Sequence, residues 1–271
     1  MSTIMVEFGT TRDGDMAARV GDLACIAIPL ESGFSVASAW RLSRPILEWH
    51  RGDVYGAECS VSDEKSFRAY LGDIALHLRQ RQALGRIETV HPISTPWGKS
   101  QTATVYAPGI VFHSTAGHGG FKLDRRRNQA MPEALRIAGG WYEEDGDWAR
   151  VAAGYPDLFT YREQASADRI LRDWCPDAWE AIHGRALTPD ESFSRERDDF
   201  SRRHAHDWVV ISARTTSAHP GYVETLASLG GRREASATRA FLVPGEDYAR
   251  RGRHGFVIDL NRHGEIELSP H

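Results

Sequence analysis

The sequence has few cysteines, little net charge and no long apolar run, and each absence excludes a class of protein. Its 271 residues include 3 cysteines, Cys25, Cys59 and Cys175, without C-x-x-C spacing. An odd number of widely spaced cysteines is typical of buried thiols in a reducing compartment, not of a disulfide framework or a zinc knuckle. No run approaches the roughly 18 apolar residues that a membrane span needs. The N-terminus also lacks a basic segment followed by an apolar one, so we expect a cytoplasmic protein without a membrane partner.

The charges of the chain nearly cancel. It has 33 Lys and Arg against 37 Asp and Glu, a formal net charge of −4. This balance creates no overall field that attracts nucleic acid, and the basic clusters at 125–127 and 250–253 lie beside acidic residues. Nucleic acid therefore stays an open alternative as a partner. With 41% hydrophobic and 26% charged residues, the composition is that of a globular protein.

Apolar spacing and turn residues divide the N-terminal part into four segments. Residues 22–30, DLACIAIPL, predict a short buried strand that ends at Pro29 and is either an edge strand or an entry strand. Residues 38–50 have apolar side chains at helical spacing interrupted by Pro45, which predicts two short helices. Residues 63–84 carry the clearest helical stripe, with Gly85 as its C-terminal cap. The proline-containing stretch 85–97 predicts a junction between an N-terminal α/β region, 1–90, and a domain covering 91–271.

The remainder of the chain predicts helices followed by strands. Turn chemistry at Ala107-Pro108-Gly109 predicts a hairpin of strands 102–106 and 110–114. Helices are expected at 132–138, between Trp141 and Trp148, at 162–174, at 176–182, from the capping box at 188–191 to about 203, and at 246–251. Strands are expected at 208–213, 222–229, 240–244 and 256–260. This order favours an α+β fold with a mostly antiparallel sheet packed against a central helical region.

The loop after the second hairpin strand is the first candidate for chemistry. The strand ends at Ser114-Thr115 and is followed by the sequence AGHGG, in which the imidazole is His118. Glycines allow a ligand to approach the backbone closely, so we expect an anion or carbonyl pocket with His118 as a catalytic group. The expected ligand-binding residues are Ser114, Thr115, Gly119 and Gly120. No Walker loop, dinucleotide fingerprint or G-x-S-x-G motif is present, and the alternative is a glycine-rich β-turn with a surface histidine.

The second candidate is the acidic run that follows two aromatic residues at 141–145, WYEED. Adjacent carboxylates repel one another unless a cation or a donor lies between them. On a helix only one or two of the three acids face a common pocket, and we expect Glu144, then Asp145, to be catalytic with His118. Trp141 and Glu143 are expected to contact a ligand. The alternative is an acidic helix N-terminus.

The sequence predicts neither a metal site nor a cofactor. The histidines do not follow H-E-x-x-H spacing. A site that combined His118, Glu144 and His206 would need a contact that the sequence does not reveal. We therefore predict no metal ligands and leave the cofactor unknown.

Three segments resemble an uncharacterised family, the DUF7007 type, carried by plasmids and phage-like elements of proteobacteria. They are STAGHGGFKL at 114–123, MP at 131–132 and GGWYEEDGDWARV at 139–151. Later phrases extend the resemblance to about 95–263: DWVVISA, SLGGRR, FLVP and GFVIDLNRH. The family has no assigned activity. Its members often carry Cys where this chain has Gly146, so the resemblance implies no thiol nucleophile here, and it implies a role in plasmid or phage transfer such as countering host defence.

Two functions from different classes remain. The first is a hydrolase or transferase that acts on a nucleotide-like or otherwise small anionic ligand through His118 and Glu144. The second is a non-catalytic inhibitor of a host defence protein, of the anti-restriction or anti-CRISPR type, with a hot spot at Trp141, Tyr142 and Asp145. The first requires His118 within about 3 to 4 Å of a carboxylate in a concave pocket. The second requires a convex, exposed aromatic patch.

A third alternative is a DNA-processing accessory factor. It would use the basic triplet 125–127, RRR, on a groove that contacts phosphates.

Overall fold

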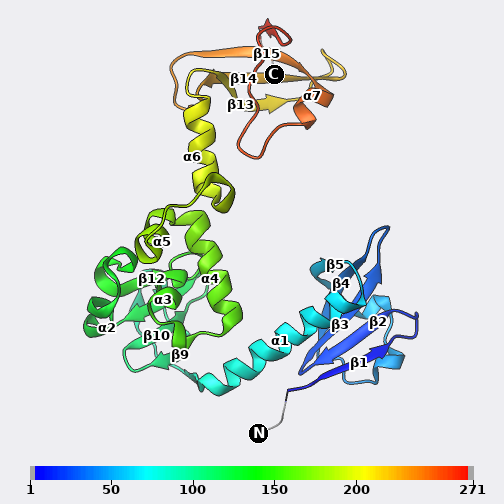
Figure 1. Ribbon diagram of the computed structural model, residues 1–271, viewed down its shortest axis with the longest axis vertical. Helices are drawn as coiled ribbons and strands as arrows, with labels where there is room; N and C mark the ends of the chain where they lie inside the picture. The colour runs from blue at the N-terminus through cyan, green and yellow to red at the C-terminus, as the bar shows by residue number, and fades with distance from the viewer. Residues whose placement is uncertain (1–3, 268–271) are drawn as a thin grey trace. The chain divides into compact units, whose positions relative to one another are not determined.

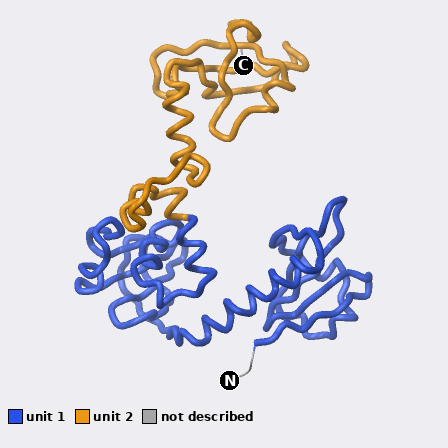
Figure 2. The backbone as a smooth tube through the Cα atoms, in the orientation of Figure 1, with its two compact units in different colours: residues 1–169 blue, residues 170–271 orange. Residues whose placement is uncertain are grey.

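The computed structural model describes residues 4–267 and has an α+β fold with antiparallel sheets, which confirms the predicted fold class. The chain divides into two compact units, Met1–Arg169 and Ile170–His271 (Figure 2). The domain junction expected near residue 90 stays a prediction.

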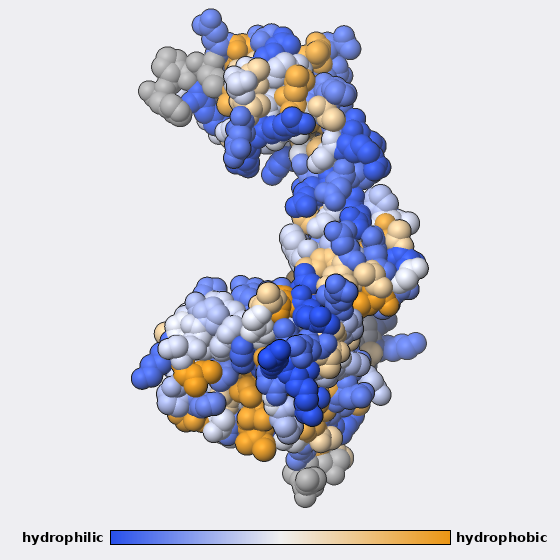
Figure 3. Space-filling view, turned by 90° about the vertical axis from the view of Figure 1, so that its left-hand side faces the viewer, coloured by the Kyte–Doolittle hydropathy of each residue, from blue (hydrophilic) through white to orange (hydrophobic). Residues whose placement is uncertain are grey.

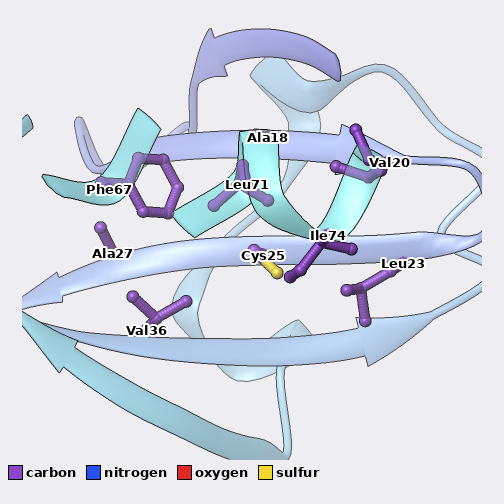
Figure 4. Close-up of a cluster of buried hydrophobic side chains, with 10 residues drawn as sticks. Ala18, Val20, Leu23, Cys25, Ala27, Val36, Phe67, Leu71 and Ile74 are labelled. Atoms are coloured by element: carbon purple, nitrogen blue, oxygen red, sulfur yellow. The ribbon is translucent and has the colours of Figure 1, made fainter. Parts of the chain in front are cut away.

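The first unit opens with a five-stranded antiparallel meander. Its strands pair in chain order: β1 Val6–Thr10, β2 Met16–Val20, β3 Leu23–Pro29, β4 Phe34–Trp40 and β5 Gly56–Val61. Helix α1, Glu64–Leu84, packs on one face through Phe67, Leu71 and Ile74 (Figure 4). Asp63 caps its N-terminus by accepting from the Ser66 N–H, and Gly85 ends it with a φ of 60°. The predicted helix and its apolar stripe are therefore confirmed.

Two predictions for this region are wrong. Strand β3 is central in the sheet, not at its edge, and five successive residues from Leu23 are buried because both faces of the sheet are covered. Residues 38–50 form no α-helix. The chain continues β4 to Trp40 and then makes 3-10 turns at Ile46–Glu48 and Arg51–Asp53. Pairing of β4 with both β3 and β5 satisfies its backbone groups and overrides the helical spacing.

A second antiparallel sheet follows α1, with the strand order β12-β11-β10-β9-β6. Its strands are β6 Ile87–Thr89, β9 Thr102–Ala107, β10 Ile110–Ser114, β11 Gly119–Leu123 and β12 Trp141–Glu143. A small hairpin, β7 Ser94–Thr95 with β8 Gly98–Lys99, lies between the first two. The predicted hairpin of β9 and β10 is confirmed, and Gly109 adopts the positive φ of 83° that its turn requires.

Helices and 3-10 turns complete this part of the chain (Figure 1): α2 Arg125–Ala130, turns at Glu133–Leu135, Ala138–Gly140 and Pro156–Leu158, α3 Trp148–Gly154 and α4 Tyr161–Trp174. The helix predicted at 132–138 is only two 3-10 turns. The helix predicted between Trp141 and Trp148 is also wrong. Residues Trp141–Glu143 form a strand because they complete the ladder with β11, and the helix begins at Trp148.

The second unit carries helices at two of the predicted places and a four-stranded sheet, and the helix predicted from residue 188 begins only at Phe193, after a 3-10 turn. Its elements are α5 Pro176–His183, a 3-10 turn at Pro189–Glu191, α6 Phe193–Arg203, β13 Trp208–Arg214, β14 Tyr222–Leu229, β15 Thr238–Pro244, α7 Gly245–Ala249 and β16 Gly264–Ile266. The predicted strand at 256–260 is reduced to an isolated bridge between Val209 and Val257. The core of this sheet contains Ala227, Phe241, Val243 and Ile258.

Candidate functional site

The loop between β10 and β11 holds His118 at one end of the second antiparallel sheet, β12-β11-β10-β9-β6. The Thr115 N–H donates to the His118 carbonyl at 2.8 Å, and the Thr115 hydroxyl donates to the same oxygen at 2.6 Å. The His118 N–H donates back to the Thr115 hydroxyl at 3.2 Å. The Thr115 hydroxyl therefore holds the turn together instead of presenting its proton to a ligand. Ser114 pairs with Gly119 at the end of the ladder.

Strand β12 brings two carboxylates to the same end of the sheet. Tyr142 lies opposite Phe121, and Glu143 lies opposite Gly120. The Glu144 N–H donates to the Gly119 carbonyl at 3.1 Å, which extends the pairing by one residue. Because side chains alternate along a strand, Glu143 and Glu144 leave opposite faces of the sheet. The predicted helical geometry would have separated them by about 100° instead.

His118 lies next to both glutamates. Its Nδ1 is 3.8 Å from Glu143 Oε1 and 3.9 Å from Glu144 Oε1. The His118 side chain is 58% exposed, and those of Glu143 and Glu144 are 29% and 33% exposed. Water and a substrate can reach the imidazole, while the carboxylates are partly shielded. These distances suit ion pairing with a protonated imidazole and are longer than a direct hydrogen bond.

The two oxygens of Glu143 have different surroundings. Oε2 accepts the N–H groups of Asp145 at 2.7 Å and Gly146 at 3.2 Å, which holds the turn before α3. Oε1 is buried and has no hydrogen-bond donor among residues 4–267. A buried acceptor without a donor costs free energy. This oxygen is also the one that faces His118.

His118, Glu143 and Glu144 are also arranged as metal ligands. Each offers one ligand atom, and the three atoms lie within 4.8 Å of one another. An imidazole with two carboxylates suits divalent first-row metals such as Mn²⁺, Fe²⁺ and Zn²⁺. The set considered from the sequence is His118, Glu144 and His206, and in the structure Glu143, not His206, lies beside the other two.

Glu144 also lines an aromatic pocket of about 430 Å³. The pocket lies on the face of the sheet that carries Phe112 and Phe121, whose rings meet edge to face at 5.1 Å. Trp148 of α3, Phe159 from the segment before α4 and Glu163 of α4 complete its lining. The lining side chains are Tyr106, Phe112, Phe121, Glu144, Trp148, Phe159 and Glu163.

An ion pair between Arg86 and Glu163 supports one wall of this pocket. Arg86 donates two hydrogen bonds to Glu163, at 2.6 and 2.9 Å, and its guanidinium lies 4.0 Å from the centre of the Tyr106 ring. Burial alone would raise the pKa of Glu163. The bonds from Arg86 and from the Thr160 N–H outweigh burial and hold the pKa of Glu163 below its usual range. Glu163 is therefore a carboxylate at neutral pH.

The other predicted site residues have varied positions. Asp145 is exposed. Trp141 lies on the sheet face opposite the pocket, where it meets Trp97 at 5.7 Å. An added Cβ at Gly119 would overlap with the Glu144 carboxylate, and one at Gly120 would overlap with the Trp97 ring. The two glycines thus allow side chains from neighbouring segments to cross the backbone closely.

The sequence did not reveal the aromatic pocket or Arg86. The available signal was the alternation of aromatic residues along the hairpin, because Tyr106, Phe112 and Phe121 fall on one face once the register is known. Phe159 and Glu163 come from a later segment, and no local pattern connects them with the hairpin.

Residues 90–205 match the family described as a domain of unknown function, DUF7007. The match supports the resemblance over these residues, which we call the DUF7007 segment. It includes His118, both glutamates and every residue that lines the aromatic pocket. Arg86 precedes the DUF7007 segment, and the strands from β13 onward follow it. No curated protein and no solved structure matches the chain.

Within residues 4–267, no helix combines the length and the apolarity that crossing a membrane requires.

Proposed function

We propose that the DUF7007 segment is an enzyme, a hydrolase or transferase that acts on a nucleotide-like substrate. One observation carries the proposal: Glu144 lies 3.9 Å from the His118 imidazole and also lines the aromatic pocket. A substrate that fills the pocket would therefore have its outer part next to His118. Concave, mostly apolar pockets with a few polar groups are the usual form of a small-molecule site.

In this proposal His118 moves the proton and Glu144 orients the imidazole. His118 is 58% exposed, so an incoming water or hydroxyl can reach its ring. The distance between His118 and Glu144 would shorten when a substrate excludes water, as catalytic contacts commonly do. The aromatic walls would stack against a nucleobase, an interaction worth about 1 to 3 kcal/mol per base.

The local charge limits where a phosphate can lie. Glu144 lines the pocket, and Glu143 and Asp145 are its neighbours in the chain. The negative charge of Glu144 repels a phosphate placed beside it. The phosphate of a nucleotide-like substrate would therefore point away from these acids or be accompanied by a divalent cation. Arg86 is already paired with Glu163 and does not offset this charge.

A second candidate function is metal-assisted hydrolysis. The observation in its favour is the set of ligand atoms on His118, Glu143 and Glu144, one of which is the buried Oε1 that lacks a donor among the described residues. A divalent cation bound there would lower the pKa of a bound water and supply the nucleophile. His118 would then be a ligand and not a base, so the two candidates respond differently to a chelator.

The aromatic hot spot of a binding protein receives less support from the geometry. Tyr142 is fully buried, and its hydroxyl donates to Asn128 at 2.6 Å. On the face drawn in Figure 3, hydrophobic residues form separate patches among hydrophilic ones. A binder would need a different surface from the one predicted at Trp141, Tyr142 and Asp145.

The cellular setting completes the proposal. From the resemblance we propose that the enzyme acts during the transfer of a mobile element, where modifying a nucleotide signal would counter host defence. We propose the cytoplasm as its location, because Cys25, Cys59 and Cys175 form no disulfide.

The test is turnover of nucleotides by the full chain and by three variants. Nucleoside mono-, di- and triphosphates are incubated with the protein, with and without Mn²⁺ or EDTA, and products are separated by chromatography. We expect His118→Ala and Glu144→Gln to lower the rate about 100-fold or more, and the exposed His206→Ala to leave it unchanged.

Full activity of His118→Ala would overturn the proposal for proton transfer. Activity that EDTA abolishes and Mn²⁺ restores would favour the second candidate.

A further inference from the structure

The aromatic pocket has the chemistry of a site for an organic cation. Its volume is about 430 Å³, and two of its seven lining side chains are carboxylates, Glu144 and Glu163. The faces of aromatic rings carry negative electrostatic potential, which attracts cations placed over them. The five aromatic walls are Tyr106, Phe112, Phe121, Trp148 and Phe159.

Two of these rings already hold a cation within the protein. The Arg86 guanidinium lies 4.0 Å from the centre of the Tyr106 ring and 5.4 Å from that of Phe159. The Arg86 side chain is only 9% exposed, and it pairs with Glu163 at 2.6 Å. The pocket rings and a carboxylate thus stabilise a buried positive charge on one side of Tyr106. Arg86 also balances the charge of Glu163.

Glu144 is not balanced in the same way. Among residues 4–267, no lysine or arginine lies at salt-bridge distance from its carboxylate, and its charged neighbour is the exposed His118 ring at 3.9 Å. The open part of the pocket therefore combines aromatic faces with one carboxylate whose charge has no fixed partner. A cation fits this combination, whereas a free phosphate in the open part of the pocket would be repelled by the Glu144 carboxylate.

We propose that the pocket binds a small organic cation, with the charge over the aromatic rings and beside Glu144. The favoured groups are a methylated ammonium or an N-alkylated ring, because their charge is spread over carbon and their water is lost at low cost. This inference shares Glu144 with the proposed function and names the charge of the substrate group that enters. An N-alkylated nucleobase would satisfy both.

Two matched pairs of ligands test the charge preference by isothermal titration calorimetry of the full chain. Choline is compared with 3,3-dimethylbutan-1-ol, which has the same shape without the charge. At pH 6, 7-methylguanosine is compared with guanosine. We expect the cation of at least one pair to bind about tenfold more tightly than its neutral match. Equal binding within both pairs, or no binding of either cation, would overturn the inference.

Variants assign the binding to the pocket. Glu144→Gln keeps the size of the side chain and removes its charge, so we expect the preferred cation to bind about tenfold more weakly. Phe112→Leu should weaken the same ligand, and Glu133→Gln, at an exposed position outside the pocket, should not. Unchanged binding by Glu144→Gln would place the cation elsewhere and reject the proposal.

His118→Ala separates this inference from the proposed function. We expect the variant to retain cation binding, because the imidazole does not line the pocket. If the His118→Ala variant binds the cation and the wild type turns over no nucleotide, the inference stands and the proposed enzyme activity is rejected. Turnover without cation preference would reject only the inference.

Discussion

The Arg86 guanidinium donates two hydrogen bonds to the Glu163 carboxylate, at 2.6 and 2.9 Å. The pair joins the segment that follows α1 to the first turn of α4. The Arg86 side chain is 9% exposed and that of Glu163 is 21% exposed. Because little water reaches either group, removing one partner leaves the other charge poorly compensated.

We expect Glu163→Gln to destabilise the protein, and the loss to depend on pH. At pH 7 the variant should lose about 2 kcal/mol of unfolding free energy, because charged hydrogen bonds are replaced by neutral ones. The pKa of Glu163 is lowered from 4.5 in the folded state. Its contribution is therefore fully present above about pH 4.5 and is lost as the pH falls through the lower, folded pKa.

Urea unfolding at pH 7 and pH 3 measures this difference. The difference in unfolding free energy between the wild type and Glu163→Gln should be smaller at pH 3 than at pH 7. The control Glu133→Gln, at an exposed position, should have nearly the unfolding free energy of the wild type at either pH. An equal difference in unfolding free energy at both pH values would show that the charge of Glu163 does not contribute to the stability of the fold.

A methyl group at Gly120 should be poorly tolerated. An added Cβ would overlap with the Trp97 ring and with the Tyr142 carbonyl oxygen. The carbonyl belongs to the β12 ladder and cannot move aside cheaply, so we expect Gly120→Ala to cost about 2 kcal/mol or more. Gly117, in the same loop, has no atom within 4 Å of an added Cβ. Thermal unfolding should show a lower melting temperature for Gly120→Ala and nearly the wild-type melting temperature for Gly117→Ala. Equal decreases in melting temperature for the two variants would contradict the packing around Gly120.

The Tyr142 hydroxyl should contribute more to stability than an ordinary surface tyrosine. It donates to Asn128 Oδ1 at 2.6 Å and accepts the Ile137 N–H at 3.1 Å. Tyr142→Phe leaves both partners without this contact, at a cost of about 1 to 3 kcal/mol. Tyr161→Phe is the control because its side chain is 67% exposed. Chemical denaturation compares the two, and a smaller loss for Tyr142→Phe than for Tyr161→Phe would be inconsistent with the structure.

Cys25 should resist alkylation in the folded protein. Burial, with smaller effects of Glu58 and Cys59, raises the pKa of the Cys25 thiol to about 12. At pH 8 almost none of it is thiolate, the reactive form. Iodoacetamide followed by peptide mass spectrometry should label Cys25 only after unfolding in urea, while the partly exposed Cys175 reacts earlier. Labelling of both at the same rate in the native state would refute this.

Elements that depend on nearby residues could be predicted from the amino-acid pattern alone. Helix α1 was predictable because Phe67, Leu71 and Ile74 repeat at helical spacing and Gly85 supplies the positive φ of its cap. The β9–β10 hairpin was predictable because Pro108 and Gly109 define its turn. His118, Glu143 and Glu144, which the sequence singles out as candidate site residues, lie close together, and their role stays a prediction.

The construction of that site depends on contacts between distant segments. Residues 141–143 became a strand because β11 offered an unpaired edge, and this pairing sent Glu144 to the face of Phe112 and Phe121. The pocket walls and the Arg86 to Glu163 pair join segments far apart in the chain. Caps and turns are set by hydrogen bonds between near neighbours, whereas strand partners and pocket walls depend on which distant segments meet, and no local pattern records that.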